Sequence, residues 1–324
     1  MATKSFFVTK NLPEKFFKNI SKKFPMEMWP NSNEEIPRQK LLERVSGKSG
    51  LLCTLSDRID RQLLDAAGPQ LKCISTLSVG YDHIDIDECK RRGIVVGNTP
   101  DVLTDAVAEL TIALLLATIR RLFEANQALR QGKWPAGWGH FFMCGSMIKG
   151  SHIGVIGGSG RIGRSVIKRL RSFEPAKISY TSRQEYPEMF REFNAEFYPL
   201  DRLLIESDII IVCCSLNDST RRLISTEQFK RMKSTSVIIN TSRGSCIDQQ
   251  ALYEALKSRK IAAAGLDVYE QEPISMDDPL LSLDNVVLLP HIGSAAQSTR
   301  EQMIQMALDN LEAGLEDRPL LASV

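Results

Sequence analysis

Three short motifs carry side chains that could bind an anion and move a proton. They read TSRG, which contains Arg243, DVYEQEP, which contains Glu272, and PHIGS, which contains His291. A guanidinium binds two oxygens in one plane, and an imidazole can donate a proton near neutral pH. Each motif follows a predicted apolar strand, and the carboxyl ends of parallel strands meet at one edge of a sheet. We therefore expect these three side chains to form one site.

Each of these residues also has an ordinary explanation. An isolated Arg is most often a surface charge, and Glu272 could simply flank Pro273 in a turn. His291 has the strongest case, because a Pro before it and a Gly after it predict a loop rather than a packing position in the core. His83 and His152 have no such setting, and we interpret them as structural.

A glycine-rich segment predicts a dinucleotide site. Gly158, Gly160 and Gly163 form the pattern G-x-G-x-x-G between a predicted strand at 153–156 and a predicted helix at 161–173. In this context the glycines permit a tight turn, a close approach of pyrophosphate to the backbone, and contact between helix and strand, while the helix N-terminus attracts the diphosphate. The preceding Gly157 is an extra glycine, so either the turn is one residue longer or the register shifts by one. The residues between the three glycines are the further expected contacts: Ser159, Arg161 and Ile162.

The tip of the next predicted strand, 177–181, bears on the choice of cofactor. A site for NAD usually carries an acidic residue about 20 positions beyond the glycines, but no carboxylate occurs here before Glu185. Ser182 and Arg183, followed by Gln184, instead offer a hydroxyl and a guanidinium, which are groups that receive a 2′-phosphate. We therefore predict NADPH in preference to NADH. The alternative is that Arg183 is a solvated loop residue.

Alternating strands and helices would position these motifs. From residue 151 onward, strands are predicted at 153–156, 177–181, 208–213, 236–240, 262–266 and 286–289, with helices at 161–173, 200–206, 226–232 and 249–258. This order is typical of a doubly wound parallel sheet. We expect the last helix, 297–313, to return to the N-terminal domain.

The first part of the chain also alternates between strand and helix patterns. Strands are predicted at 4–9, 50–55, 73–77 and 94–96, with helical segments at 37–45 and 85–92. Residues 101–131 contain neither Gly nor Pro and predict one long helix, suited to a domain junction or a subunit interface. The alternative for that helix is the core of a large monomer. The loop 132–145 is rich in aromatic side chains and predicts no regular element.

Composition excludes several classes of protein. The 324 residues include 41 Lys and Arg against 39 Asp and Glu, and 43% are hydrophobic, which predicts a large core in two domains. The interleaved charges, with a net charge of +2, argue against a nucleic-acid partner. Seven cysteines without C-x-x-C spacing indicate reduced thiols and no metal site. Because no signal-peptide pattern or apolar stretch of membrane-spanning length occurs, we expect a cytoplasmic protein without membrane contact.

Taken together, these motifs resemble the D-isomer-specific 2-hydroxyacid dehydrogenases. The likeness includes VGYDHIDID at 79–87, NTPDVLTDAVAEL at 98–110, the glycine fingerprint and the three motifs of the expected site. Within that family the chain is similar to the glyoxylate/hydroxypyruvate reductase branch, in TLSVG at 76–80 and YTSRQ at 180–184. The likeness covers nearly the whole chain and is weakest at 132–159.

The resemblance implies a role for each residue of the site. Arg243 would bind the carboxylate and ketone of a substrate, His291 would protonate the developing alkoxide, and Glu272 would orient the imidazole and favour its protonated form. Val79 and Gly80 would present backbone N–H groups to the substrate carboxylate, and Asp267 would hold the nicotinamide carboxamide. The remaining implied contacts are Ser215, Thr241 and Gly293 with the cofactor, and Ser294 and Trp138 with the substrate, Trp138 reaching the neighbouring subunit.

The implied fold is α/β, with two Rossmann-like domains built on doubly wound parallel sheets, the first of them discontinuous. A flavodoxin-like substrate-binding domain would comprise 1–104 plus 296–324, and a dinucleotide-binding Rossmann domain would comprise 105–295. The implied activity is NADPH/NADP-dependent reduction of small 2-keto acids, hydroxypyruvate to D-glycerate and glyoxylate to glycolate, by a homodimer joined through the helix starting near Asp105. The alternatives are a dinucleotide-sensing, corepressor-like regulator on the same fold and a phosphoglycerate or formate type of dehydrogenase.

Overall fold

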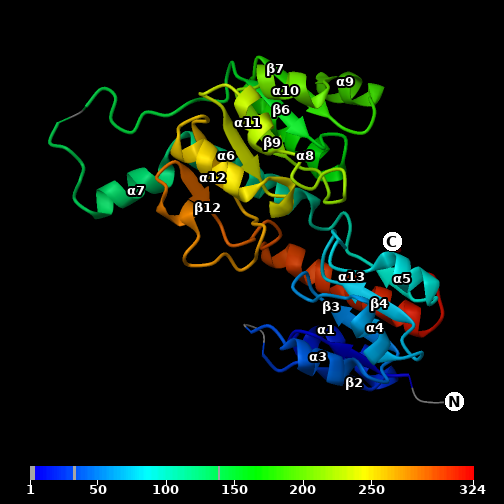
Figure 1. Ribbon diagram of the computed structural model, residues 1–324. Coiled ribbons are helices and arrows are strands. Elements are labelled where there is room, and N and C mark those ends of the chain that lie inside the picture. Colours follow the sequence, from blue (N-terminus) through cyan, green and yellow to red (C-terminus); the bar gives the residue numbers. More distant parts are fainter. Residues whose placement is uncertain (1–3, 32–33, 138) are drawn as a thin grey trace. The chain divides into compact units, whose positions relative to one another are not determined.

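The structure is a computed structural model that describes residues 4–31, 34–137 and 139–324. It divides into two compact units, unit 1 within Met1–Leu103 and Ala295–Val324, and unit 2 within Thr104–Ser294. Each unit has its own parallel sheet covered by helices (Figure 1). This confirms the predicted fold class of two parallel-sheet α/β domains.

Unit 1 has a five-stranded sheet in the order β2-β1-β3-β4-β5. Its interior strands β3 and β4 are short and buried along their whole length, as expected of a sheet covered on both faces. The last helix of the chain, α13, belongs to this unit and contacts β3 and β4. The strands are β1 (Phe6–Val8), β2 (Met26–Met28), β3 (Gly50–Cys53), β4 (Cys73–Thr76) and β5 (Val95–Gly97), and the helices are α1 (Glu14–Phe17), α2 (Ile20–Lys23), α3 (Arg38–Val45), α4 (Arg61–Ala67), α5 (Ile86–Arg91) and α13 (Gln297–Leu315).

Unit 2 has a seven-stranded sheet in the order β12-β11-β10-β9-β6-β7-β8. Alternate residues of its central strands belong to different core clusters, so Ile210 packs with α10, α11 and α12 while Ile211 packs with α6 and α8. The strands are β6 (His152–Ile156), β7 (Lys177–Thr181), β8 (Ala195–Phe197), β9 (Ile209–Val212), β10 (Val237–Asn240), β11 (Ala263–Leu266) and β12 (Val286–Leu288), and the helices are α6 (Thr104–Ile119), α7 (Leu122–Arg130), α8 (Arg161–Leu170), α9 (Pro187–Phe193), α10 (Leu200–Glu206), α11 (Thr226–Arg231) and α12 (Gln249–Lys257). Three short 3-10 helices are η1 (Arg171–Phe173), η2 (Gly244–Cys246) and η3 (Pro279–Ser282).

The prediction of one helix over 101–131 is wrong. The chain forms α6 and then α7, and the break lies at Arg121, whose φ of 52° is left-handed. A distant segment ends α6: the backbone N–H of Ser146 donates to the carbonyl oxygen of Ile119 (2.9 Å). Gly145 makes this approach feasible, because an added Cβ would lie 1.9 Å from that same oxygen. A helix-favouring pattern is thus overridden by tertiary backbone contact.

Several short elements escaped the sequence analysis. The strands β2 and β8 have only three residues each and lie at sheet edges, where β2 pairs in parallel with β1 and β8 with β7. Neither has enough residues to show a period of two. None of the helices in the part of the chain that the structure describes is long and apolar enough to cross a membrane.

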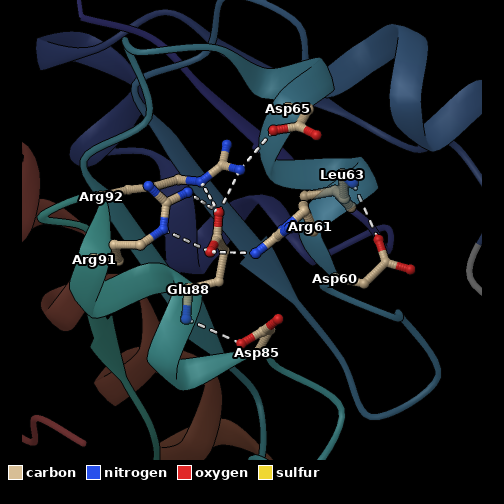
Figure 2. A network of polar contacts seen from close by, with 8 residues as sticks. All are labelled: Asp60, Arg61, Leu63, Asp65, Asp85, Glu88, Arg91 and Arg92. Carbon is tan, nitrogen blue, oxygen red and sulfur yellow. Dashed lines mark hydrogen bonds and ion pairs between the residues drawn. The ribbon is translucent and has the colours of Figure 1, made fainter.

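A buried carboxylate organises part of unit 1. Glu88 on α5 has a side chain only 4% exposed, and Arg61, Arg91 and Arg92 converge on it (Figure 2). The Nε atom of Arg91 donates to Oε2 of Glu88 at 2.9 Å, and the Nε atom of Arg92 donates to Oε1 at 2.7 Å. Hydrogen bonds from Arg91 and Arg92 lower the pKa of Glu88 to about 2.

This network predicts an acid-dependent contribution to stability. The ordinary pKa of a Glu is 4.5, so the Glu88 charge stabilises the fold fully above that value and the contribution is lost as the pH falls toward about 2. We expect Glu88→Gln to lower the thermal unfolding midpoint at pH 7, and the difference from the native chain to shrink as the pH is lowered through this window.

Calorimetry at several pH values measures this difference. Glu43→Gln is the control, because Glu43 forms an exposed pair with Lys40, and such pairs contribute little. A Glu88→Gln midpoint equal to that of the control at pH 7 would contradict the assignment.

Candidate active site

The glycine-rich turn connects β6 to α8. Gly157 follows the strand directly with a φ of +79°, and an added Cβ would lie 2.7 Å from the backbone of Cys214. Gly163 allows α8 to pack directly against the turn, because a Cβ added to Gly163 would lie 2.5 Å from the carbonyl oxygen of Gly157. Gly157 therefore occupies the position at the end of the strand, and the turn contains one residue more than G-x-G-x-x-G requires.

The geometry of this turn fits a pyrophosphate. Gly160 is the N-cap of α8 and makes no side-chain capping bond, which leaves this helix end suited to an anion. Arg161 and Ile162 begin the helix, and Arg161 is exposed. Gly158 is buried, and an added Cβ would lie 2.6 Å from Cβ of Tyr180 on the neighbouring strand β7.

The tip of β7 lies next to this turn. The backbone N–H of Gly157 donates to the carbonyl oxygen of Thr181 (2.8 Å), which is the last residue of β7. Ser182 donates its hydroxyl to the carbonyl oxygen of Gln184 (2.5 Å), so the chain turns sharply after the strand. Arg183 between them is exposed to solvent.

The loop after β10 carries Arg243. The buried side chain of Asn240 spans this loop, accepting from the backbone N–H of Ser242 (3.0 Å) and donating to the carbonyl oxygen of Arg243 (2.9 Å). The guanidinium of Arg243 donates to the carbonyl oxygen of Ser242 (2.9 Å). The hydroxyl of Thr241 lies 2.7 Å from that of Thr111 on α6, which fixes the loop to a helix.

The loop after β11 lies against the Arg243 loop. An added Cβ on Gly244 would lie 1.8 Å from the carbonyl carbon of Tyr269, so the two backbones touch. The Tyr269 hydroxyl donates to the carbonyl oxygen of Leu289 (2.8 Å), near the end of β12. The loops that follow three neighbouring strands are therefore in direct contact.

Glu272 and His291 form a hydrogen-bonded pair. The Nδ1 atom of His291 lies 2.5 Å from Oε2 of Glu272, and Oε1 of Glu272 accepts the backbone N–H of Tyr269 (3.0 Å). Both side chains are about one-third exposed, at 28% and 34%. His291 has a φ of +52°, a left-handed conformation that non-glycine residues adopt rarely and that is often found at functional sites.

Asp267 fixes the backbone on the other side of His291. Its carboxylate accepts the backbone N–H groups of Ile292 (2.8 Å) and Gly293 (2.7 Å), and the residue is 1% exposed. Burial raises its pKa above the ordinary value in spite of these two bonds. Ser294 follows Gly293 and is half-buried, while Ser215, after β9, is exposed.

The loop after β4 belongs to unit 1. The hydroxyl of Ser78 donates to the carbonyl oxygen of Gly80 (2.7 Å), and the side chain of Asn98 donates to that of Val79 (2.9 Å). Both carbonyls are thereby tied back to the protein. Trp138 lies outside the described residues.

The sequence analysis missed Asn240 and Tyr269, whose side chains hold the loops of Arg243 and Glu272. An Asn at a strand end, two residues before a Ser and three before an Arg, is a signal for an Asx turn that could have identified the first. The second had no such signal, because its partner at Leu289 is distant in the sequence.

A groove of about 480 Å³ lies elsewhere on unit 2, against side chains of α11 and α12 such as Phe229 and Glu254, and no described residue of the predicted site lines it. Within the described ranges, no group of three or more His, Cys, Asp or Glu side chains is arranged to hold a metal ion.

Comparison with known proteins identifies relatives of the whole chain. Residues 112–293 match the family model of the D-isomer specific 2-hydroxyacid dehydrogenase, NAD binding domain. The chain is 51% identical to a glyoxylate reductase/hydroxypyruvate reductase of Mus musculus over 290 residues, which cover 90% of this chain and 88% of that protein. It is 43% identical over 310 residues to a glyoxylate reductase of Korarchaeum cryptofilum, covering 95% and 91% of the two chains.

Two solved structures of reductases match this chain over its whole length. A glyoxylate reductase from Paecilomyes thermophila matches with a TM-score of 0.89 at 31% identity, covering 100% of this chain and 99% of that one. An NADPH-dependent glyoxylate/hydroxypyruvate reductase from Sinorhizobium meliloti, in complex with NADP and malonate, matches with a TM-score of 0.84 at 32% identity, covering 100% and 97%.

Proposed function

Because the chain belongs to the D-isomer-specific 2-hydroxyacid dehydrogenase family, we propose that it reduces small 2-keto acids with NADPH, converting glyoxylate to glycolate and hydroxypyruvate to D-glycerate. The observation that carries this proposal is the His291–Glu272 pair, in which the loop of Glu272 also touches the loop of Arg243. The glyoxylate/hydroxypyruvate reductases among its relatives support the choice of substrates.

A bound nicotinamide nucleotide would supply the hydride that adds to the keto carbon. The guanidinium of Arg243 binds the carboxylate and the keto oxygen of the substrate and stabilises the negative charge that develops on that oxygen. The imidazole of His291 donates the proton that completes the alcohol. Glu272 accepts from Nδ1 of His291 and so presents the other ring nitrogen to the substrate.

The remaining contacts extend this assignment. The backbone N–H groups of Val79 and Gly80 bind the substrate carboxylate, and their loop is held by Ser78 and Asn98. Ser294 and Trp138 complete the proposed substrate contacts. The proposed cofactor contacts are the glycine turn from Gly158 to Gly163 together with Ser182, Arg183, Gln184, Ser215, Thr241, Asp267 and Gly293.

The preference for NADPH rests on the tip of β7. Arg183 is exposed there beside the glycine turn, and the first carboxylate after the strand is that of Glu185. A 2′-phosphate would gain charge-assisted hydrogen bonds at this tip without repulsion from an acid at the strand end. The Sinorhizobium meliloti relative is named as NADPH-dependent.

We also propose a homodimer formed through α6, α7 and the segment after them. Figure 1 shows α7 and the described residues 131–137 extending away from the sheet of their own unit. Phe123, Leu129, Trp134 and Phe141 expose between 55% and 87% of their surface there. Exposed apolar surface of this extent on α7 and the segment after it indicates a protein interface, and the same surface of a second copy is a complementary partner.

The reaction is tested by following NADPH and NADH oxidation with glyoxylate, hydroxypyruvate, pyruvate and phosphohydroxypyruvate. We expect His291→Gln to lower kcat by about 10²- to 10⁴-fold, the range for a lost general acid, with NADPH binding unchanged. Glu272→Gln should also lower kcat. Glu270→Gln is the matched control, because Glu270 is an exposed neighbour that pairs with Arg222. Stoichiometric NADPH binding without turnover of any keto acid would instead favour a dinucleotide-sensing regulator.

Arg183→Ala tests the cofactor preference. We expect the ratio of kcat/KM for NADPH to that for NADH to fall by roughly 10- to 100-fold, the value of a hydrogen bond to a charged group. Arg259→Ala is the control, because Arg259 forms an exposed pair with Asp284. An unchanged ratio would assign Arg183 to the solvated surface.

Light scattering tests the dimer. Asp substitutions at Phe123 and Phe141 place charges on the proposed interface, so we expect the double variant to dissociate at concentrations where the native chain is dimeric. Met276→Asp changes an equally exposed apolar side chain elsewhere on unit 2 and should have no effect. A native chain that is monomeric at every concentration would contradict the proposal.

A further inference from the structure

The glycine turn is one residue longer than its motif requires, and its hydrogen bonds show where the extra residue lies. The backbone N–H of Gly157 is bound to Thr181, and the N–H of Gly160 donates to the carbonyl oxygen of Gly157 (3.1 Å). Both ends of the turn are thereby fixed. Gly158 and Ser159 lie between these anchors, and Ser159 contributes two further soft backbone dihedrals to a segment that must present its N–H groups to an anion.

The side chain of Arg164 holds this inserted part of the turn. Its Nε atom donates to the carbonyl oxygen of Ser159 (2.8 Å), and its Nη2 atom donates to Oε1 of Glu188 (2.7 Å). Glu188 lies in the first turn of α9, just beyond the tip of β7. The hydrogen bond from Arg164 lowers the pKa of Glu188, which is therefore an anion at neutral pH.

The placement of these two bonds distinguishes Arg164 from an ordinary surface arginine. One bond goes to a main-chain carbonyl inside the turn, and the other goes to the helix that follows the proposed 2′-phosphate contacts. The guanidinium therefore connects the turn that receives the pyrophosphate in the proposed function with the helix that begins just after the proposed 2′-phosphate contacts. Its side chain is 30% exposed, and that of Glu188 is 33% exposed.

We infer that Arg164 is a positioning residue for the cofactor, which holds the carbonyl of Ser159 so that the N–H groups of the lengthened turn stay directed toward the pyrophosphate. This inference rests on the proposed function and adds to it a residue outside the glycine motif. Ordering the turn before the nucleotide arrives removes an entropic cost from binding. Without the guanidinium, that cost falls on the binding of any nucleotide with a pyrophosphate, whether or not it has a 2′-phosphate.

Arg164→Met tests the inference, because Met retains an apolar stem and removes the guanidinium. Titration of NADPH and NADH by nicotinamide fluorescence should show both dissociation constants raised by roughly tenfold, the loss expected for one hydrogen bond from a charged donor. Adenosine 2′-monophosphate has the 2′-phosphate but no pyrophosphate, so its competition with NADPH should give the same dissociation constant for the variant as for the native chain. The ratio of NADPH to NADH affinity should also stay constant, unlike the ratio in Arg183→Ala.

Arg169→Met is a closely matched control. Arg169 lies on the same helix and also donates to a main-chain carbonyl, that of Ser165, and to a carboxylate, that of Asp105. We expect this control to leave nucleotide binding unchanged. Glu188→Gln retains the bond from Arg164 to Ser159 but weakens the ion pair that holds Arg164. It should therefore raise both dissociation constants by less than Arg164→Met does. If Arg164→Met fails to fold, Glu188→Gln provides the test.

The outcomes separate the inference from the proposed function. Native-like NADPH and NADH binding by Arg164→Met, or equal weakening by Arg169→Met, would overturn the inference alone. Equal weakening of adenosine 2′-monophosphate would also overturn it, because the whole nucleotide site would then have been distorted. A native chain that binds neither NADPH nor NADH would overturn the cofactor proposal and the inference with it.

Discussion

Direct contact between backbones at the carboxyl edge of the seven-stranded sheet is the constraint on which the site depends. Parallel strands deliver their following loops to one edge, and at two places on this edge the backbones touch at a residue that has no side chain. Gly244 lies against the Tyr269 carbonyl group, and Gly157 lies against the backbone of Cys214. A methyl group at either position would clash with the facing backbone, so one of the two segments would have to move. These contacts therefore set the positions of the Arg243 loop and of the phosphate turn.

Once the loops touch, a chain of hydrogen bonds orients His291, the proposed proton donor. The Tyr269 hydroxyl is bound to Leu289, its backbone N–H holds Glu272, and Glu272 holds His291. From the other side, the buried Asp267 carboxylate binds the two backbone N–H groups that follow His291. The left-handed conformation of His291 is thus held from both directions. Such support fixes a functional side chain before a substrate binds, so little ordering remains to be done during the reaction.

The same edge accommodates a departure from the family's glycine motif. The extra residue lies in a segment between β6 and α8 whose two ends are held by hydrogen bonds, from Gly157 to Thr181 and from Gly160 to Gly157. Arg164, one position beyond the last glycine, reaches back to the inserted carbonyl. An extra residue in this glycine-rich turn is therefore compatible with hydrogen-bonded ends and with a side chain, that of Arg164, bound to a carbonyl inside the turn.

The sequence by itself determined the fold class and the order of most strands, and it indicated the three motifs of the proposed site, because buried parallel strands are continuous apolar runs and glycine-rich turns carry a local signature. It also indicated that Gly157 is an extra glycine, but left open whether the turn is one residue longer or the register shifts by one. Only the tertiary structure decided that the turn is longer, that α6 ends at Ile119, and that Asn240, Tyr269 and Arg164 hold the site's loops. The end of α6 and the bond from Tyr269 to Leu289 depend on contacts between segments that are distant in the sequence and that a local pattern does not relate. The α6 helix ends because Ser146, 27 positions later, takes the hydrogen bond of its last carbonyl.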